Sequence, residues 1–388
     1  MKNKFSMLDK MNIPPILGST RTAIEEGLQA AARIAICDVI KLKEGEQVLI
    51  ISNPQNDVSV ISGALFDAAT EFGGNAVLVF QREKTQIDFS EKCVLAAFEA
   101  KPQVVISISS GKLGKDEKGI AGAYTFKGKV YDHIFHLQQF GEKSCRAFWS
   151  PAVTVDSFLR TVPIDYALLK KRCTAINEVL DDAVNVRVSA PGGTDILIGL
   201  QGRKAKSDDG DFSFMGAGGN LPAGESFISP QNGTSNGTIV FDGSISLHDK
   251  DIIIEEPIIC EVQNGFVTSI NGGKEAAMLQ ETISLAETNA LMFEKNGRII
   301  AGMGEVYKKN ARNIGELGIG LNPNAKISGN MLEDEKAFCT CHFAIGQNYD
   351  EDAPSLIHLD GLVKKPTITA IMSDSSEVII EKDGILCS

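Results

Sequence analysis

Residues Gly45–Gln81 read GEQVLIISNPQNDVSVISGALFDAATEFGGNAVLVFQ, and this stretch decides the fold class of the first half of the chain. An apolar run at Gln47–Ser52 is followed by a segment with helical spacing, Val58–Phe72, and by a second apolar run, Asn75–Gln81. A strand, a helix and a strand in this order are typical of parallel strands joined by a helical crossover. We therefore expect an α/β layer with a mainly parallel sheet.

The same alternation extends on both sides of this stretch. Amphipathic or apolar patterns predict helices at Thr22–Leu42 and Glu91–Ala100, and a buried strand at Pro102–Ser109. A further helix, Tyr166–Asp182, leads out of this region. We expect residues 1–183 to form one α/β domain.

The pattern changes after Val184, where short alternating runs are separated by Gly, Asn and Asp. One helix is expected there, near Lys274–Ala290. Residues 184–388 are therefore predicted to form a β-rich, α+β second domain. Its expected strands are Asn185–Val188, Asp195–Leu200, Thr238–Phe241, Ile252–Val262, Phe266–Ile270 and Glu377–Ile380, with a glycine-rich loop at Gly216–Gly224.

Composition excludes several classes of function. The chain has 388 residues, with 50 acidic against 38 basic ones and a formal net charge of -12, so most of its surface would repel nucleic acid. No apolar run reaches membrane-spanning length, and the charged N-terminus lacks the apolar segment of a secretory signal. The eight cysteines are scattered and do not indicate a disulfide framework. We expect a cytoplasmic protein with neither nucleic-acid nor membrane partners.

Five side chains in the second half belong to the types that bind divalent cations: Glu225, Glu316, His342, His358 and Asp360. His358 and Asp360 are two residues apart in a run typical of a strand, so both should lie on one face, with Cα atoms roughly 7 Å apart. Two imidazoles with three carboxylates favour zinc, manganese, cobalt or ferrous iron over a structural thiolate site. We therefore expect a metalloenzyme whose site lies in the β-rich domain.

Each candidate also has a simpler interpretation. An H-x-D pair is common without metal, and His342 is compatible with a buried core histidine. Glu225 follows Pro-Ala-Gly and could be a turn residue, whereas Glu316 would be costly to bury without a partner. Four such contexts in one chain favour a single shared site over four coincidences.

These contexts, in this order, resemble the aminopeptidase T family of metallo-aminopeptidases. The resemblance implies a two-metal site with Glu225, Glu316, His342, His358 and Asp360 as ligands, Tyr349 at the metal centre, peptide substrates and a homodimer. The motifs that carry the resemblance are Gly192–Ile196, Gly219–Glu225, Gly237–Ser244, Glu316–Asn322, Asp334–Lys336, the run that follows His342, and His358–Gly361.

Two alternatives remain open. The same fold family includes a mononuclear-iron dioxygenase that opens a dihydroxypyridine ring, and the tail His358–Thr367 is similar to that branch. Two histidines with one carboxylate also suit a ferrous oxygenase. The second alternative is a metal-binding protein without catalytic activity.

The preferred function is a metal-dependent aminopeptidase that removes N-terminal residues with a water activated by two divalent ions, Zn, Co or Mn. Asp360 is the expected bridging ligand. Glu225 or Glu316 could accept the proton of the attacking water, and the residues do not decide between them. Tyr349 could donate a hydrogen bond to the oxyanion, ligate one of the ions, or simply pack beside its loop.

Overall fold

The computed structural model describes residues 6–8, 11–13, 16, 18–85, 88–299 and 301–387. The chain divides into two compact units, one of residues 1–170 and 210–223 and the other of residues 171–209 and 224–388. The division falls inside helix α7 (Tyr166–Asp182) rather than between residues 183 and 184, and a short segment returns to the first unit. Residues 1–5, where the absence of a secretory signal is expected, lie outside the described part.

The first unit is built on a five-stranded sheet in the order β10-β6-β3-β1-β2. Every pairing in this sheet is parallel, which confirms the mainly parallel sheet expected from the sequence. β4 and β5, which follow β3 in the sequence, form a separate two-stranded antiparallel ribbon. The strands are β1 (Gln47–Ser52), β2 (Asn75–Phe80), β3 (Val104–Ile108), β4 (Tyr124–Phe126), β5 (Lys129–Tyr131), β6 (Arg146–Trp149) and β10 (Gly218–Asn220).

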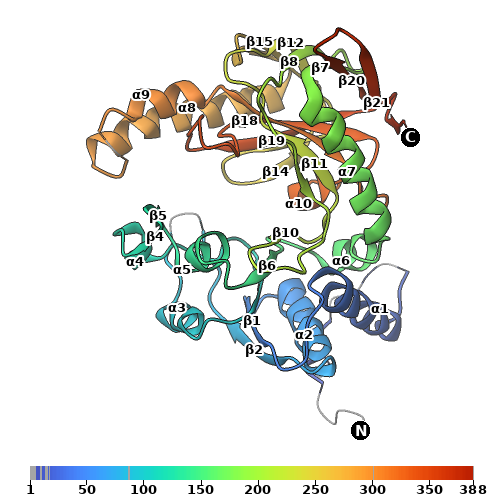
Figure 1. The fold of residues 1–388 in the computed structure, drawn as a ribbon, viewed down its shortest axis with the longest axis vertical. Helices are drawn as coiled ribbons and strands as arrows, with labels where there is room; N and C mark the ends of the chain where they lie inside the picture. Colours follow the sequence, from blue (N-terminus) through green and yellow to red (C-terminus); the bar gives the residue numbers. More distant parts are fainter. Residues whose placement is uncertain are drawn as a thin grey trace. The chain divides into compact units, whose positions relative to one another are not determined.

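Helices cover both faces of this sheet (Figure 1). Helix α2 connects β1 to β2 on one side of β1, and α3 connects β2 to β3 on the other side of β1. Because the two connections run in opposite directions across the sheet, right-handed crossovers place α2 and α3 on opposite faces. The helices are α1 (Arg21–Ile34), continued by the π-helical turn η2 (Ala35–Val39), α2 (Asn56–Glu71), α3 (Lys92–Glu99), α4 (Glu117–Ile120), α5 (Ile134–His136), continued by η3 (Leu137–Gly141), and α6 (Val155–Thr161).

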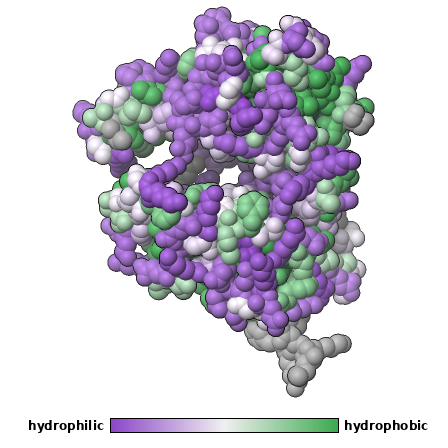
Figure 2. Space-filling model, viewed as in Figure 1, coloured by the Kyte–Doolittle hydropathy of each residue, from purple (hydrophilic) through white to green (hydrophobic). Residues whose placement is uncertain are grey.

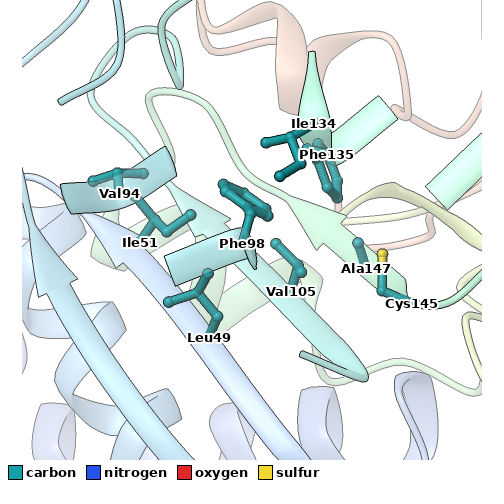
Figure 3. Packing of buried hydrophobic residues seen from close by; sticks show 9 residues of the cluster. All are labelled: Leu49, Ile51, Val94, Phe98, Val105, Ile134, Phe135, Cys145 and Ala147. Carbon is teal, nitrogen blue, oxygen red and sulfur yellow. The ribbon is translucent and has the colours of Figure 1, made fainter. Parts of the chain in front are cut away.

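One side of the sheet packs on a compact apolar cluster (Figure 3). Phe98 of α3 is fully buried between strand residues such as Leu49 and Val105 and the aromatic ring of Phe135. Burial of a side chain of this size stabilises the fold by roughly 2 to 3 kcal/mol. The first unit therefore has a core of its own.

The second unit contains two antiparallel sheets, as the β-rich prediction requires. An eight-stranded sheet has the order β16-β15-β12-β8-β7-β20-β21-β22, and a seven-stranded sheet has the order β14-β13-β19-β18-β17-β11-β9. The strands of the first are β7 (Ala183–Ser189), β8 (Asp195–Gly199), β12 (Asn236–Phe241), β15 (Ile258–Gln263), β16 (Phe266–Asn271), β20 (Thr367–Met372), β21 (Glu377–Lys382) and β22 (Ile385–Leu386). Those of the second are β9 (Lys206–Asp208), β11 (Glu225–Ile228), β13 (Ser244–Ser246), β14 (Asp251–Ile253), β17 (Ile314–Gly320), β18 (Thr340–Gly346) and β19 (His358–Lys364).

The two sheets of this unit contact each other through apolar side chains. The ring of Phe241 on β12 lies directly over Gly361 on β19, at a spacing that leaves no room for a larger residue. The helices of the unit are α8 (Lys274–Lys295), which packs on β15 and β16, α9 (Gly304–Asn310) and α10 (Met331–Asp334). None of the described helices is long and apolar enough to cross a bilayer.

Three expectations need correction. Residues Ile252–Val262 form two strands, β14 and β15, because Pro257 lacks the N–H that a continuous ladder would use. Helix α8 continues five residues beyond Ala290. Within the glycine-rich Gly216–Gly224, β10 pairs with β6, and Gly218 permits this approach because a side chain there would collide with the β6 backbone.

The end of the eight-stranded sheet carries exposed apolar side chains. Val378, Ile379 and Ile385 are exposed on β21 and β22, the last two strands in the order of this sheet. Figure 2 shows apolar surface in the region of β7, β20 and β21, whereas most of the remaining surface in that view is hydrophilic. This edge is a candidate contact surface.

Candidate metal centre

Adjacent strands of the seven-stranded sheet carry all five predicted ligands. Glu225 begins β11, Glu316 lies on β17, His342 on β18, and His358 and Asp360 on β19. Pairing places Gly318 opposite His342 and Ala344 opposite both Glu316 and Asp360, so the ligands occupy neighbouring rows on one face. Residues that alternate with them, such as Phe343, point to the core between the sheets.

A glycine on β17 makes room for one imidazole. A Cβ atom added at Gly318 would overlap Nε2 and Cε1 of His342, far inside the 3.0 Å that side-chain carbons keep. The His342 ring therefore lies across the backbone of β17, with Nε2 turned toward the carboxylates on that strand and on β11. The glycine at position 318 within the Glu316–Asn322 motif therefore has a local function in placing this imidazole.

The carboxylate of Glu316 lies between the two imidazoles. Its Oε1 is 3.3 Å from Nε2 of His342, and its Oε2 is 3.3 Å from Nε2 of His358. Glu225 Oε2 lies 3.6 Å from Nε2 of His342, and Asp360 Oδ1 lies 3.2 Å from Nε2 of His358. The expected same-face placement of His358 and Asp360 is confirmed. Glu316 and Asp360 each belong to one group with His342 and one group with His358, so Asp360 as the bridging ligand stays a prediction beside Glu316.

The ligand atoms fall into three groups whose members lie within 4.8 Å of one another. Two groups share Glu316, and the third brings in a carboxylate that the sequence did not indicate. The groups are Glu225, Glu316 and His342; Glu316, His358 and Asp360; and Glu335, His342 and Asp360.

Electrostatics at this centre stabilise positive charge. Burial alone would raise the pKa of Glu316, but the adjacent imidazoles of His342 and His358 lower it. Burial would likewise raise the pKa of Asp360, yet His358 holds it at about 2. Burial alone would lower the pKa of His342, but Glu316 and Glu225 raise it to about 9. These carboxylates stay ionised and attract cations, which must displace protons from the imidazoles to bind.

Several buried polar atoms at the centre lack a hydrogen-bond partner, which is the pattern expected of a metal site. They are Glu225 Oε2, Glu316 Oε2, Asp360 Oδ1 and His342 Nδ1. In contrast, Nδ1 of His358 donates to the carbonyl oxygen of Gln347 at 2.7 Å, which leaves its Nε2 free to ligate a cation. The donor set, oxygen-rich with two imidazoles, fits a borderline divalent ion.

Tyr349 lies at the open side of the centre. Its ring is 5.0 Å from that of His358 in an edge-on arrangement and 5.2 Å from that of Phe227. The residue is 51% exposed, so a ligand in solution can reach it. Its loop is held by Lys206, whose Nζ donates to the Tyr349 carbonyl and to Asp350, both at 2.8 Å.

Sequence reasoning missed three charged residues beside the centre. Lys336 is completely buried, and its Nζ lies 2.5 Å from Glu225 Oε1, 2.5 Å from Glu335 Oε1 and 3.7 Å from Asp208 Oδ2. Burial alone would lower the pKa of Lys336, but Glu225 and Glu335 raise it well above its usual value. The motif Asp334–Lys336 had been noted, but no periodic or metal-spacing signal gave it a role.

The neighbouring thiols do not join the centre. Cys341 is buried on the alternate face of β18, and Cys339 is half-buried. Burial raises the pKa of the Cys341 thiol well above its usual value, which disfavours the thiolate that metals bind. This placement agrees with the expectation that the centre is not a structural thiolate site.

Comparison with known proteins links this geometry to two enzymes. A family model described as "NicX: 2,5-dihydroxypyridine 5,6-dioxygenase" matches residues 154–345. A 2,5-dihydroxypyridine 5,6-dioxygenase of Pseudomonas putida is 28% identical over 166 residues, which span 42% of this chain and 41% of that relative. The family-model match covers the segment that holds Glu225, Glu316 and His342.

Solved structures extend the likeness to nearly the whole chain. The 2,5-dihydroxypyridine dioxygenase from Pseudomonas putida KT2440 superposes with a TM-score of 0.66 at 18% identity, covering 95% of this chain and 98% of that one. AmpT, an aminopeptidase T, from Thermus thermophilus superposes with a TM-score of 0.65 at 15% identity, covering 94% and 100%. The chain shares one fold with both enzymes. The matches found from sequence and the ligand geometry together support a metal-dependent enzyme.

Proposed function

We propose that this chain is a metal-dependent aminopeptidase that hydrolyses the N-terminal residue of peptides at a centre of two divalent ions, Zn, Co or Mn. One observation carries the proposal: the two oxygens of Glu316 face different imidazoles, those of His342 and His358. A carboxylate in this position can ligate two ions at once, as in the paired sites of hydrolases.

The ligand groups supply the two positions. Glu225 and His342 would hold one ion, His358 and Asp360 would hold the other, and Glu316 would contribute an oxygen to each. Each position then has one imidazole and two carboxylates, a ligand set that leaves further coordination for water and substrate. When bound, such ions lower the pKa of water and stabilise negative charge that develops on a carbonyl oxygen.

Residues around the ions would accept the proton of the water, stabilise the oxyanion and contact the substrate. Glu225 and Glu316 are both candidates for the proton acceptor, since Oε2 of each is buried without a hydrogen bond. Tyr349 is exposed beside His358 and would donate its hydroxyl proton to the developing oxyanion. Together with Phe227, its ring also offers an apolar wall for a substrate side chain.

A ferrous ring-cleaving dioxygenase is the second candidate, and a specific observation favours it. The matches found from sequence name a 2,5-dihydroxypyridine 5,6-dioxygenase. His342, His358 and Asp360 would supply the two imidazoles and one carboxylate that ferrous oxygenases use. In this structure no ligand group contains both imidazoles, which is why the two-ion arrangement is preferred.

Metal content and turnover of anaerobically purified protein test the proposal. Two equivalents of a divalent ion with cleavage of aminoacyl chromogenic substrates are expected. One equivalent of iron with oxygen uptake on 2,5-dihydroxypyridine would replace the hydrolase by the dioxygenase, and a protein without metal or turnover would be a non-catalytic one.

Substitution of Glu225 separates the two enzymes. Glu225→Gln keeps the shape of the side chain but removes its charge, so it should retain one tightly bound ion and lose hydrolysis by roughly 100-fold or more. Full hydrolytic turnover in Glu225→Gln would contradict the two-ion mechanism. A dioxygenase site of His342, His358 and Asp360 would retain its iron in this variant.

A further inference from the structure

Lys336 is a buried cation that the proposed reaction does not use. It follows α10 and is completely inaccessible, with an ammonium group placed among carboxylates from β9, β11 and its own segment. Its backbone is fixed on both sides, since Lys336 N donates to Glu333 O at 3.0 Å and Asn322 N donates to Lys336 O at 2.9 Å. The side chain therefore enters the centre from a defined position.

The contacts of this ammonium resemble those of a bound ion. Three carboxylates surround it, those of Glu225, Glu335 and Asp208. Burial of an unpaired ammonium costs several kcal/mol, and burial of the three carboxylates without a counter-charge would cost more. The position thus requires a positive charge, and here the chain itself supplies it.

The ammonium group also gives the two oxygens of Glu225 different surroundings. Oε1 is 2.5 Å from Lys336 Nζ, whereas Oε2 faces His342 at 3.6 Å and has no hydrogen bond. A carboxylate held in this way offers a single oxygen to an ion near His342. Without the lysine, the same carboxylate could turn or bind an ion through both oxygens.

We propose that Lys336 is a positioning residue that fills a third cation position contiguous with the metal centre, holds Glu225 as a one-oxygen ligand and limits the centre to two divalent ions. The number of ions, two, rests on the proposed function, whereas the filled cation position rests on the contacts of Lys336. A lysine in place of an ion makes this part of the centre permanent, because it does not exchange with the metals in solution.

Ion stoichiometry tests the proposal directly. Lys336→Met keeps an unbranched side chain that ends at Cε and removes the ammonium group with its charge, whereas Lys336→Arg keeps the charge. After equilibration with excess Mn²⁺ and gel filtration, elemental analysis should find one more equivalent of Mn²⁺ in Lys336→Met than in the parent protein, and no additional equivalent in Lys336→Arg. Adding Asp208→Asn to Lys336→Met should remove the extra equivalent, because it takes away one of the three carboxylates.

Matched controls keep the result interpretable. Lys84 is nearly buried and paired with Glu91 at 2.7 Å in the first unit, whereas the ligands belong to the second unit, so Lys84→Met should leave the Mn²⁺ count unchanged. If Lys336→Met shows no folded transition in thermal unfolding, Lys336→Gln, which retains an N–H donor without charge, should show the extra equivalent instead.

The outcomes separate this inference from the proposed function. Equal Mn²⁺ counts in the parent and in the uncharged variants would overturn the role assigned to Lys336. A parent that binds one ion or lacks hydrolysis would overturn the two-ion aminopeptidase, while an additional equivalent in Lys336→Met relative to that parent would still support the filled cation position.

Discussion

Substitution of Gly318 by alanine would test the position of the His342 imidazole more directly than removal of the histidine. The added methyl group would overlap Nε2 and Cε1 of His342. Gly318 lies within a regular strand and is not among the residues with positive φ, so the backbone itself can accept alanine. The perturbation is therefore confined to the imidazole and its ligand nitrogen.

The expected magnitude follows from packing. His342 is 1% exposed, so its ring has no solvent space into which it can move. Overpacking of this kind costs about 1 to 3 kcal/mol, or roughly 2 to 12 °C in Tm for a unit of this size. Displacement of Nε2 should also weaken the ion held with Glu225 at least about tenfold, which corresponds to about 1.4 kcal/mol. The ion held by His358 and Asp360 should remain.

Gly361 offers the matched control. A methyl group there would meet Cδ1 of Phe241 at 2.5 Å, on the opposite face of the same sheet. Gly361→Ala should therefore lower Tm by a similar amount and leave the ion count unchanged. Titration with Zn²⁺ followed by elemental analysis distinguishes the two variants. Parent-like affinity for both ions in Gly318→Ala would show that the placement of His342 against β17 does not determine the site.

Three further predictions concern the ligands, a buried carboxyl group and assembly. His358→Ala or Asp360→Ala should abolish activity and ion binding at that position while the folded transition of the first unit persists, because that unit has its own core; unchanged metal content would contradict both assignments. Burial raises the pKa of Glu381 from 4.5 to about 8, so its contribution to stability is full below pH 4.5 and is lost as pH rises through 8. Between pH 5 and pH 9, the free energy of unfolding measured by denaturant titration should fall by a few kcal/mol less in Glu381→Gln than in the parent protein. An unchanged pH dependence would refute the burial argument. A homodimer is expected, with the exposed apolar side chains of β21 and β22 as the candidate contact, and light scattering of a monomer at micromolar concentration would exclude it.

Local patterns were sufficient to predict the α/β unit. Strand β1 occupies the expected Gln47–Ser52, and α2 begins two residues before Val58. Apolar runs in this region are long, and the pair Gly73–Gly74 separates helix from strand, so the sequence marks each boundary locally. Likewise, α7 has its expected bounds.

The strands that carry the centre gave weaker signals. Every residue of β17 and of β18 is buried, so neither strand shows the alternation of polar and apolar residues that marks a half-exposed strand. Their glycines, including Gly318, further dilute the apolar pattern. The contact of Lys336 with Glu225 joins residues 111 positions apart, and no local spacing could indicate it. The ligands were found from residue types and a resemblance, whereas their arrangement needed the fold.

Charge balance explains why the centre attracts cations. Around the centre, five carboxylates face one buried ammonium group, so four negative charges remain when all carboxylates are ionised. Each buried charge left uncompensated costs several kcal/mol, which divalent cations would offset. Burial raises the pKa of Glu335 to about 8, so a proton on this carboxyl group reduces the remaining charge to three, midway between the charges of one and of two divalent ions. The same reasoning explains why loss of the Lys336 charge should recruit a cation. The groups that enter this balance are Asp208, Glu225, Glu316, Glu335, Asp360 and Lys336.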